Sequence, residues 1–195
     1  MKRKSLGREA SLGVILIFAV AVTGFINPRF VTGDGTRDLL SATSIVALLA
    51  IGIAPVMIMR HIDLSIASTV GFSAWLVADF CAKNPSFTWW QCFVIGGAVG
   101  IAVGVINGLL VAGLRLPSLV VTLGTLYIVR GGVYVVSNSV DYNAQEMPPS
   151  LLSLGQKTFA GLLPFPFLMV IILMVIVGWY MKYTKPGRDC YAIGS

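Results

Sequence analysis

Long charge-free, apolar stretches separated by short charged ones dominate this chain, and six such stretches lie between residues 10 and 181. A helix needs about 20 mostly apolar residues to cross the hydrocarbon core of a bilayer. Two of the stretches are short, but they reach this length when one charged residue is included in each, Asp79 in the third and Arg130 in the fifth. The pattern therefore predicts six membrane-spanning helices, at about residues 10–28, 39–59, 64–82, 92–114, 116–136 and 160–181.

The composition favours a surface that faces lipid. Of the 195 residues, 56% are hydrophobic and 11% are charged, and the mean hydropathy is +0.87. Soluble domains carry about 25% charged residues, and this chain has too few polar residues to cover a soluble surface. We predict an all-α membrane protein, a polytopic transmembrane helix bundle in which residues 1–195 form one transmembrane domain.

Basic residues are distributed unequally between the two sides of the six spans. Nine lie on the side of the N-terminus: Lys2, Arg3, Lys4, Arg8, Arg60, Arg115, Lys182, Lys185 and Arg188. Four lie on the other side: Arg29, Arg37, Lys83 and Lys157. Because Lys and Arg are retained in cytoplasmic loops, both ends of this multi-pass chain are predicted to be cytoplasmic. The same rule explains the net charge of +6, so no nucleic-acid partner is expected.

The first span resembles a secretory signal, because basic residues precede the apolar run 12–22. Such a signal would normally be followed by a soluble mature domain. Since further apolar stretches follow instead, we expect this span to be retained.

The fourth predicted span carries three glycines at intervals of four, Gly100, Gly104 and Gly108. This spacing places them on one helix face, where a second helix can approach closely because side chains are missing. Asn107 lies beside this row. An amide at membrane depth is expected either to hydrogen-bond with a neighbouring helix or to contact a solute.

Asp79 and Arg130 are ionisable residues inside predicted spans, where charge is costly. Two interpretations stay open for both: they line a translocation path, or they lie near the external interface and extend toward water. Asp63 is expected to cap a helix that starts at Leu64, because its carboxylate can accept hydrogen bonds from free amides of the first turn.

Loop composition separates the two sides of the membrane further. Residues 60–63 and 115–117 are predicted to be tight cytoplasmic turns, whereas residues 137–161 form a long polar external segment. Within that segment, Leu151-Leu152-Ser153-Leu154 is expected to form a short amphipathic helix at the outer surface.

The chain offers no catalytic, cofactor or metal constellation in its sequence. Its three cysteines, Cys81, Cys92 and Cys190, are odd in number and lack a CxxC spacing, so neither a metal site nor a disulfide framework is indicated. Free thiols are the preferred interpretation, although Cys81 and Cys92 flank one predicted external turn and a bridge between them remains an alternative. No Gly-Lys dipeptide occurs, so a phosphate-binding P-loop is not expected and any ATP hydrolysis must come from a partner.

Three stretches carry a resemblance to a known family: residues 60–68 (RHIDLSIAS), 116–131 (LPSLVVTLGTLYIVRG) and 184–194 (TKPGRDCYAIG). In order and spacing they resemble permease subunits of bacterial ATP-binding-cassette importers for simple sugars, of the ribose, rhamnose and autoinducer-2 type. The resemblance implies import of a monosaccharide or related small polar solute across the bacterial inner membrane. It also implies cytoplasmic ATPase subunits, a periplasmic solute-binding protein and a second permease subunit as partners.

In such importers the Gly-Arg and Tyr-Ala-Ile-Gly element lies in the cytoplasmic loop that docks into the ATPase. The resemblance therefore makes five residues candidates for coupling: Gly187, Arg188, Tyr191, Ala192 and Gly194. Family members continue beyond this point with further helices, so the chain is expected to be incomplete. Ala67 stands where the family usually has glycine, which puts close helix approach there in question.

Two other functions stay open at this stage. A permease of the same fold could carry amino acids or nucleosides instead of sugars. An ion-coupled secondary transporter would favour buried acids and broken helices, and the predicted spans show no acid pair at mid-membrane depth.

Overall fold

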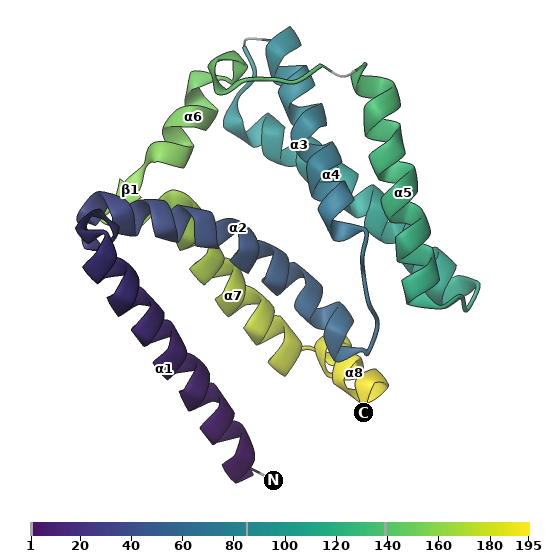
Figure 1. Cartoon of the computed structure of the whole chain (residues 1–195). Coiled ribbons are helices and arrows are strands. Elements are labelled where there is room, and N and C mark those ends of the chain that lie inside the picture. Colours follow the sequence, from purple (N-terminus) through teal and green to yellow (C-terminus); the bar gives the residue numbers. More distant parts are fainter. Residues whose placement is uncertain (1, 85, 139) are drawn as a thin grey trace.

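The computed structural model describes residues 2–84, 86–138 and 140–195, with side chains described from residue 10 onward. The chain is mostly helical, as predicted (Figure 1). Its α-helices are α1 (Lys2–Ile26), α2 (Gly33–Ile58), α3 (Ile66–Lys83), α4 (Trp89–Gly108), α5 (Ser118–Ser137), α6 (Pro149–Gln156), α7 (Phe165–Tyr183) and α8 (Lys185–Gly194). Short elements complete the fold: 3-10 turns Pro28–Val31 and Ala144–Glu146, a π-helical turn Leu109–Gly113, and strands β1 (Thr158–Phe159) and β2 (Leu163–Pro164).

The long helices form two packed groups. α3 packs against both α4 and α5, while α2 lies along α7, and α1 extends away from both groups (Figure 1). The fully buried side chains are small, namely Ser44, Ser65 and Cys81, whereas many large apolar residues are exposed. Exposed apolar helix surface is compatible with lipid, because a helix satisfies its own backbone hydrogen bonds.

Four helical segments are long and apolar enough to cross a membrane within residues 2–84, 86–138 and 140–195: Gly33–Ile58, Trp89–Gly113, Ser118–Ser137 and Phe165–Tyr183. They correspond to four of the six predicted spans. The remaining two predictions are not confirmed. The apolar part of α1, Ala10–Ile26, is shorter, and the hydropathy of α3 is reduced by its hydroxyl side chains and by Asp79 and Lys83.

α2 begins at Gly33, six residues before the predicted start of its span, because its polar first turns are stabilised locally. The Thr32 hydroxyl accepts a hydrogen bond from the Gly35 amide at 3.3 Å. Arg37 forms an ion pair with Asp34 at 3.0 Å and donates from Nε to the Gly161 carbonyl at 2.9 Å. Arg37 thus ties the N-terminal end of α2 to the β1–β2 turn. The two strands, each of two residues, were not part of the all-α prediction.

The predicted tight turn at residues 60–63 is not confirmed, because only residues 59 and 60 form a turn, while residues 61–64 continue without regular structure beside the start of α5. We call residues 59–65 the connector. Arg60 leaves α2 with a positive φ of 60°. The Ile62 amide donates to Ser118 Oγ at 3.2 Å, and Thr122 Oγ1 donates to the Ile62 carbonyl at 3.2 Å. These bonds pair the non-helical backbone with α5.

The expected cap of the third helix by Asp63 is not confirmed, because Ser65 occupies the N-cap position of α3 and no side chain caps the first turn. Asp63 Oδ1 accepts from the Ser65 amide at 2.8 Å and from its hydroxyl at 2.6 Å. α3 then begins at Ile66, two residues after the predicted position. The amphipathic helix expected around residues 151–154 is present as α6, and it packs beside α4 and α7.

Candidate functional site

α8 follows α7 directly and begins with a hydrogen-bonded cap. Thr184 separates the two helices in an extended conformation, and its hydroxyl accepts a hydrogen bond from the Gly187 amide at 3.2 Å. A proline in the first turn suits a helix start, since its missing amide would be unpaired there anyway. The predicted basic loop is therefore a short, capped helix.

Two glycines fit α8 closely against the ends of two longer helices. A Cβ on Gly187 would lie 2.6 Å from the Met181 α-carbon and would collide with the Tyr180 carbonyl of α7. A Cβ on Gly194 would collide with the Ile58 carbonyl at the end of α2. Because backbone atoms cannot move aside as flexible side chains do, only glycine fits these two positions without displacing α8.

The five candidate coupling residues therefore divide into two groups. Gly187 and Gly194 face the membrane helices, whereas Arg188, Tyr191 and Ala192 are exposed. Arg188 donates to the Tyr183 carbonyl at 3.1 Å, so its side chain lies across the junction of α7 and α8. Ile193 is also exposed, at 63%, and sequence reasoning did not single it out.

A second constellation joins three helical elements through buried polar side chains. Asn107 of α4 donates from Nδ2 to the Ser65 hydroxyl at 2.9 Å, and its Oδ1 accepts from the Thr125 hydroxyl of α5 at 2.6 Å. Ser65, Asn107 and Thr125 are all buried, and we call them the polar node. These bonds are of the kind expected for an amide that links helices at membrane depth.

The polar node shows how far the connector extends along α5. Thr125 lies seven residues into α5, which corresponds to about 10 Å along the helix axis. Ser65, at the start of α3, is linked to this level through Asn107. The chain between α2 and α3 thus continues without helical structure past the first turns of α5. Non-helical backbone at such a depth occurs where it is buried in protein or lines a cavity.

A cavity of about 350 Å³ lies beside the connector. Its walls come from the connector, α4 and α5, and include His61, Asp63, Asn107 and Thr122, with Ile193 of α8 also contributing. Gly104 and Gly108 line this cavity as well. The cavity therefore lies between α8 and the polar node.

The predicted close approach of a helix to the glycine row is not found among the described residues. A Cβ placed on Gly100, Gly104 or Gly108 would meet no atom within 4 Å. The spacing of four does place the glycines on one face, but that face borders open space and, for two of them, the cavity. Close packing of a helix against this glycine face stays a prediction, and the helix would have to come from outside this chain.

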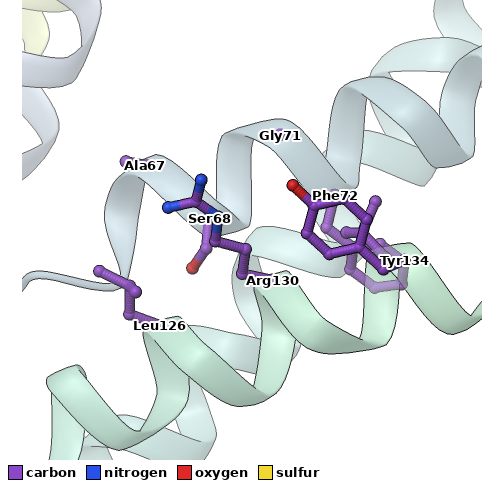
Figure 2. A pocket seen from close by; sticks show the side chains of 8 residues that line it. Ala67, Ser68, Gly71, Phe72, Leu126, Arg130 and Tyr134 are labelled. Atoms are coloured by element: carbon purple, nitrogen blue, oxygen red, sulfur yellow. The ribbon is translucent and has the colours of Figure 1, made fainter. Parts of the chain in front are cut away.

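Arg130 lies in a pocket between α3 and α5. The pocket has a volume of about 390 Å³ and is lined by Ala67, Ser68, Gly71, Phe72, Leu126, Arg130, Val133 and Tyr134. Figure 2 shows the guanidinium extending from α5 toward Ser68 on α3. Arg130 is seven residues from the end of α5, about 10 Å along the axis, and it has no hydrogen-bond or ion-pair partner within the described part of the chain.

Asp79, the other ionisable residue expected inside a span, has two partners near the C-terminal end of α3. Lys83 lies 2.7 Å from its carboxylate, and the Tyr142 hydroxyl donates to it at 2.6 Å. This carboxylate raises the pKa of the Tyr142 phenol above its usual value. The Trp75 indole donates to the Val140 carbonyl at 3.2 Å, so the segment that follows α5 is fixed to α3 at two points. Asp79 does not line the Arg130 pocket.

Sequence reasoning missed Ser65, Ser68 and Thr125, because isolated hydroxyl residues are common in membrane helices. The one available indication is the spacing of Thr122 and Thr125, which places two hydroxyls on one face of α5. No group of three or more His, Cys, Asp or Glu that could hold a metal occurs in residues 2–84, 86–138 and 140–195.

Comparisons with known proteins agree with a transport role. The autoinducer 2 import system permease protein LsrC of Enterobacter sp. (strain 638) is 35% identical over 198 residues, which cover 100% of this chain and 55% of the relative. The protein of the same name from Klebsiella pneumoniae is 35% identical over 197 residues, with the same coverage. That from Yersinia pestis (strain Pestoides F) is 30% identical over 188 residues, covering 96% and 52%.

The chain spans about half the length of the curated relatives it matches. No solved structure matches it. Residues 35–195 match a family described as "Branched-chain amino acid transport system / permease component". With this match and the apolar helices described above, the chain belongs to the permease family of that description.

Proposed function

We propose that this chain is part of a transmembrane permease subunit of an ATP-binding-cassette importer, with α8 as the element that docks into a cytoplasmic ATPase. The observation that carries the proposal is the fit of Gly187 and Gly194 against the ends of α7 and α2. This fit fixes α8 to the membrane helices while it leaves Arg188 and Tyr191 exposed for a partner. A force applied to α8 is therefore transmitted to two long helices at once.

The proposed orientation places α8 and the N-terminus in the cytoplasm of a bacterium, with the chain in the inner membrane. The excess of basic residues on that side supports this orientation. In this arrangement α1 and α3 also cross the membrane, which gives six spans. α3 starts at the depth of the polar node, so its 18 residues, about 27 Å long, extend beyond the outer end of α5.

Coupling follows a chain of direct contacts. α8 meets the end of α2 at Gly194 and Ile58, and α2 continues into the connector, which is hydrogen-bonded to α5. The connector ends at Ser65 in the polar node. Movement of α8 toward or away from the membrane thus shifts the connector and with it the inner end of α3. Such a rigid-body shift is one way in which a transporter opens its path alternately to each side.

The solute path in this proposal includes the pocket between α3 and α5. Arg130 and Ser68 offer hydrogen-bond donors, and Phe72 and Tyr134 offer ring surfaces. This combination suits a small polyhydroxylated solute, since hydroxyl groups accept hydrogen bonds while the carbon faces of a sugar pack on aromatic rings. The relatives named as autoinducer 2 import permeases support a sugar-like solute for this chain.

A second solute class is favoured by a specific observation. The matching family is described by branched-chain amino acid transport, so an amino acid would be carried through the same helices. Uptake of radiolabelled sugars and amino acids into vesicles, each competing with the other, distinguishes these classes.

Affinity purification from gently solubilised membranes tests the proposal as a whole. An ATPase subunit and a second permease subunit are expected to copurify, and a periplasmic solute-binding protein is expected to stimulate ATP hydrolysis. Uptake that persists with a proton uncoupler while ATP is present agrees with the proposal. Uptake abolished by the uncoupler at constant ATP would instead identify an ion-coupled transporter.

A further inference from the structure

We propose that Cys81 and Cys92 form a disulfide that closes the α3–α4 hairpin at its outer end. Cys81 lies in the last turn of α3 and Cys92 in the first turn of α4. Their sulfur atoms are 3.4 Å apart, and both residues are buried, with exposed fractions of 1% and 5%. In this structure both carry thiols.

The surrounding hairpin holds the two sulfurs in register. α3 packs along α4, and the rings of Phe80 and Phe87 stack at 6.2 Å across the turn. At the start of α4, the Gln91 side chain accepts hydrogen bonds from both the amide and the hydroxyl of Thr88. Because a disulfide is about 2.05 Å long, the sulfurs need to approach by about 1.4 Å.

Both thiols border cavities of the protein. A cavity of about 370 Å³, lined in part by Gln145, Glu146 and Met147 of the external segment, borders Cys81. Cys92 borders a second cavity beneath Leu151 of α6. In the orientation of the proposed function this hairpin lies on the extracytoplasmic side, where disulfides form and persist. The inference rests on the proposed function for the oxidising compartment. The identity of the two bonded cysteines rests on the distance between their sulfur atoms.

The oxidant is a disulfide of the extracytoplasmic compartment, and the reaction is thiol–disulfide exchange. One cysteine loses its proton, and its thiolate attacks a sulfur of the oxidant, which releases one thiol of the oxidant and leaves a mixed disulfide. The second cysteine then attacks the protein sulfur of that mixed disulfide, and the second thiol of the oxidant leaves. Two protons and two electrons pass from Cys81 and Cys92 to the oxidant, which is reduced to two thiols.

The bond would fix the outer end of α3, the helix that carries both Asp79 and Phe72. Asp79, two residues before Cys81, binds Lys83 and Tyr142. Phe72, on the same helix, lines the Arg130 pocket. With its outer end tied to α4, α3 is expected to move mainly at its inner end, where the connector joins it.

Counting thiols in the chain made in cells tests the proposal. Cells are quenched in acid, so that no thiol reacts further, and the denatured protein is blocked with N-ethylmaleimide. It is then reduced and treated with a polyethylene-glycol maleimide, which shifts the gel band once for each newly exposed thiol. The native chain is expected to show two shifts, and Cys190→Ser is expected to show the same two.

The matched variants Cys81→Ser and Cys92→Ser are expected to show no shift. Absence of any shift in the native chain would overturn the proposal, and this measurement does not depend on how well a variant folds. Labelling of Cys190 in intact and permeabilised cells reports the orientation separately. Two shifts together with Cys190 labelled in intact cells would reject the proposed orientation while retaining the disulfide.

Discussion

Gly194 of α8 lies directly against the backbone carbonyl of Ile58 at the end of α2, and a Cβ at residue 194 would collide with that oxygen. The Ile58 carbonyl carbon would be 3.0 Å from the same Cβ. Both atoms belong to the backbone, so the clash can be relieved only by moving one helix relative to the other. The position of α8 is thus coupled to that of α2 through one residue without a side chain.

Gly194→Ala is expected to displace α8 and to reduce solute-stimulated ATP hydrolysis by the reconstituted transporter several-fold. Gly178→Ala in α7 is the matched control, because a Cβ there would meet no atom within 4 Å. Alanine is favoured over glycine in a helix by about 1 kcal/mol, so the control is expected to keep full activity. Equal activity of the two variants would contradict the proposed coupling contact.

Arg188→Glu is expected to lower solute-stimulated ATP hydrolysis while the protein remains in the membrane at its normal level. The reversed charge would face the partner surface that the exposed guanidinium is proposed to contact, and it would lose the hydrogen bond to the Tyr183 carbonyl. Arg188→Lys keeps the positive charge and is expected to retain most of the activity. Hydrolysis is measured with and without solute, beside an immunoblot of the membrane fraction.

The sequence predicted the long apolar helices well, because lipid imposes a simple rule of length and charge. The fifth predicted span, 116–136, differs from α5 by two residues at its start and one at its end. The second predicted span, 39–59, starts six residues after α2 does, since the prediction followed a charge-free window and left Asp34 and Arg37 outside it. Their ion pair and the bonds to Gly161 instead allow a helix to continue through polar residues.

The sequence predicted that Asn107 could bond to a neighbouring helix, but the connector and the partners of Asn107 lay beyond sequence reasoning. A polar turn between two apolar runs has the same local pattern at an interface as inside a protein, so residues 60–63 were interpreted as a surface turn. Asn107 bonds to Ser65 and Thr125, which are 42 and 18 residues away, and no local period reports such distances. The row Gly100, Gly104 and Gly108 shows the same limit of sequence reasoning. Its spacing identifies one face of α4, but it does not identify which element, if any, packs against that face.

Asn107→Leu is expected to destabilise the chain, because it removes the amide that joins α4, α5 and the start of α3. Hydrogen bonds between membrane helices contribute about 0.6 kcal/mol on average and up to about 1.7 kcal/mol. A double-mutant cycle with Thr125→Val, measured by thermal denaturation in detergent, is expected to give a coupling energy in that range. A coupling energy of zero would show that the bond between these two side chains is not formed in the protein.

Tyr142→Phe is expected to loosen the external segment, because it removes the hydrogen bond to Asp79. Faster protease cleavage within residues 140–161 is the measured result, with Tyr134→Phe as the control.

The raised pKa of Tyr142 also sets a pH dependence. The folded state holds the phenol proton more tightly than the unfolded state, so the bond contributes fully below pH 10, the ordinary pKa of tyrosine, and its contribution is lost as the pH rises through the higher folded value. Cleavage of the native chain should therefore not change between pH 6 and 9 on this account.

Arg130→Gln is expected to raise the KM of solute uptake by about tenfold while protein level and basal ATP hydrolysis stay unchanged. The guanidinium has no partner within the described part of the chain, so its removal breaks no internal bond. Loss of a hydrogen bond from a charged donor costs about 1.5–3 kcal/mol, which corresponds to at least a tenfold change in affinity.

Arg130→Lys retains the charge but not the planar array of donors, and an intermediate KM is expected. Tyr127→Phe, on the exposed surface of α5 and outside the pocket, is the control. If Arg130→Gln left KM unchanged and reduced the amount of folded protein, Arg130 would be a structural residue near the membrane surface and the pocket would not belong to the solute path.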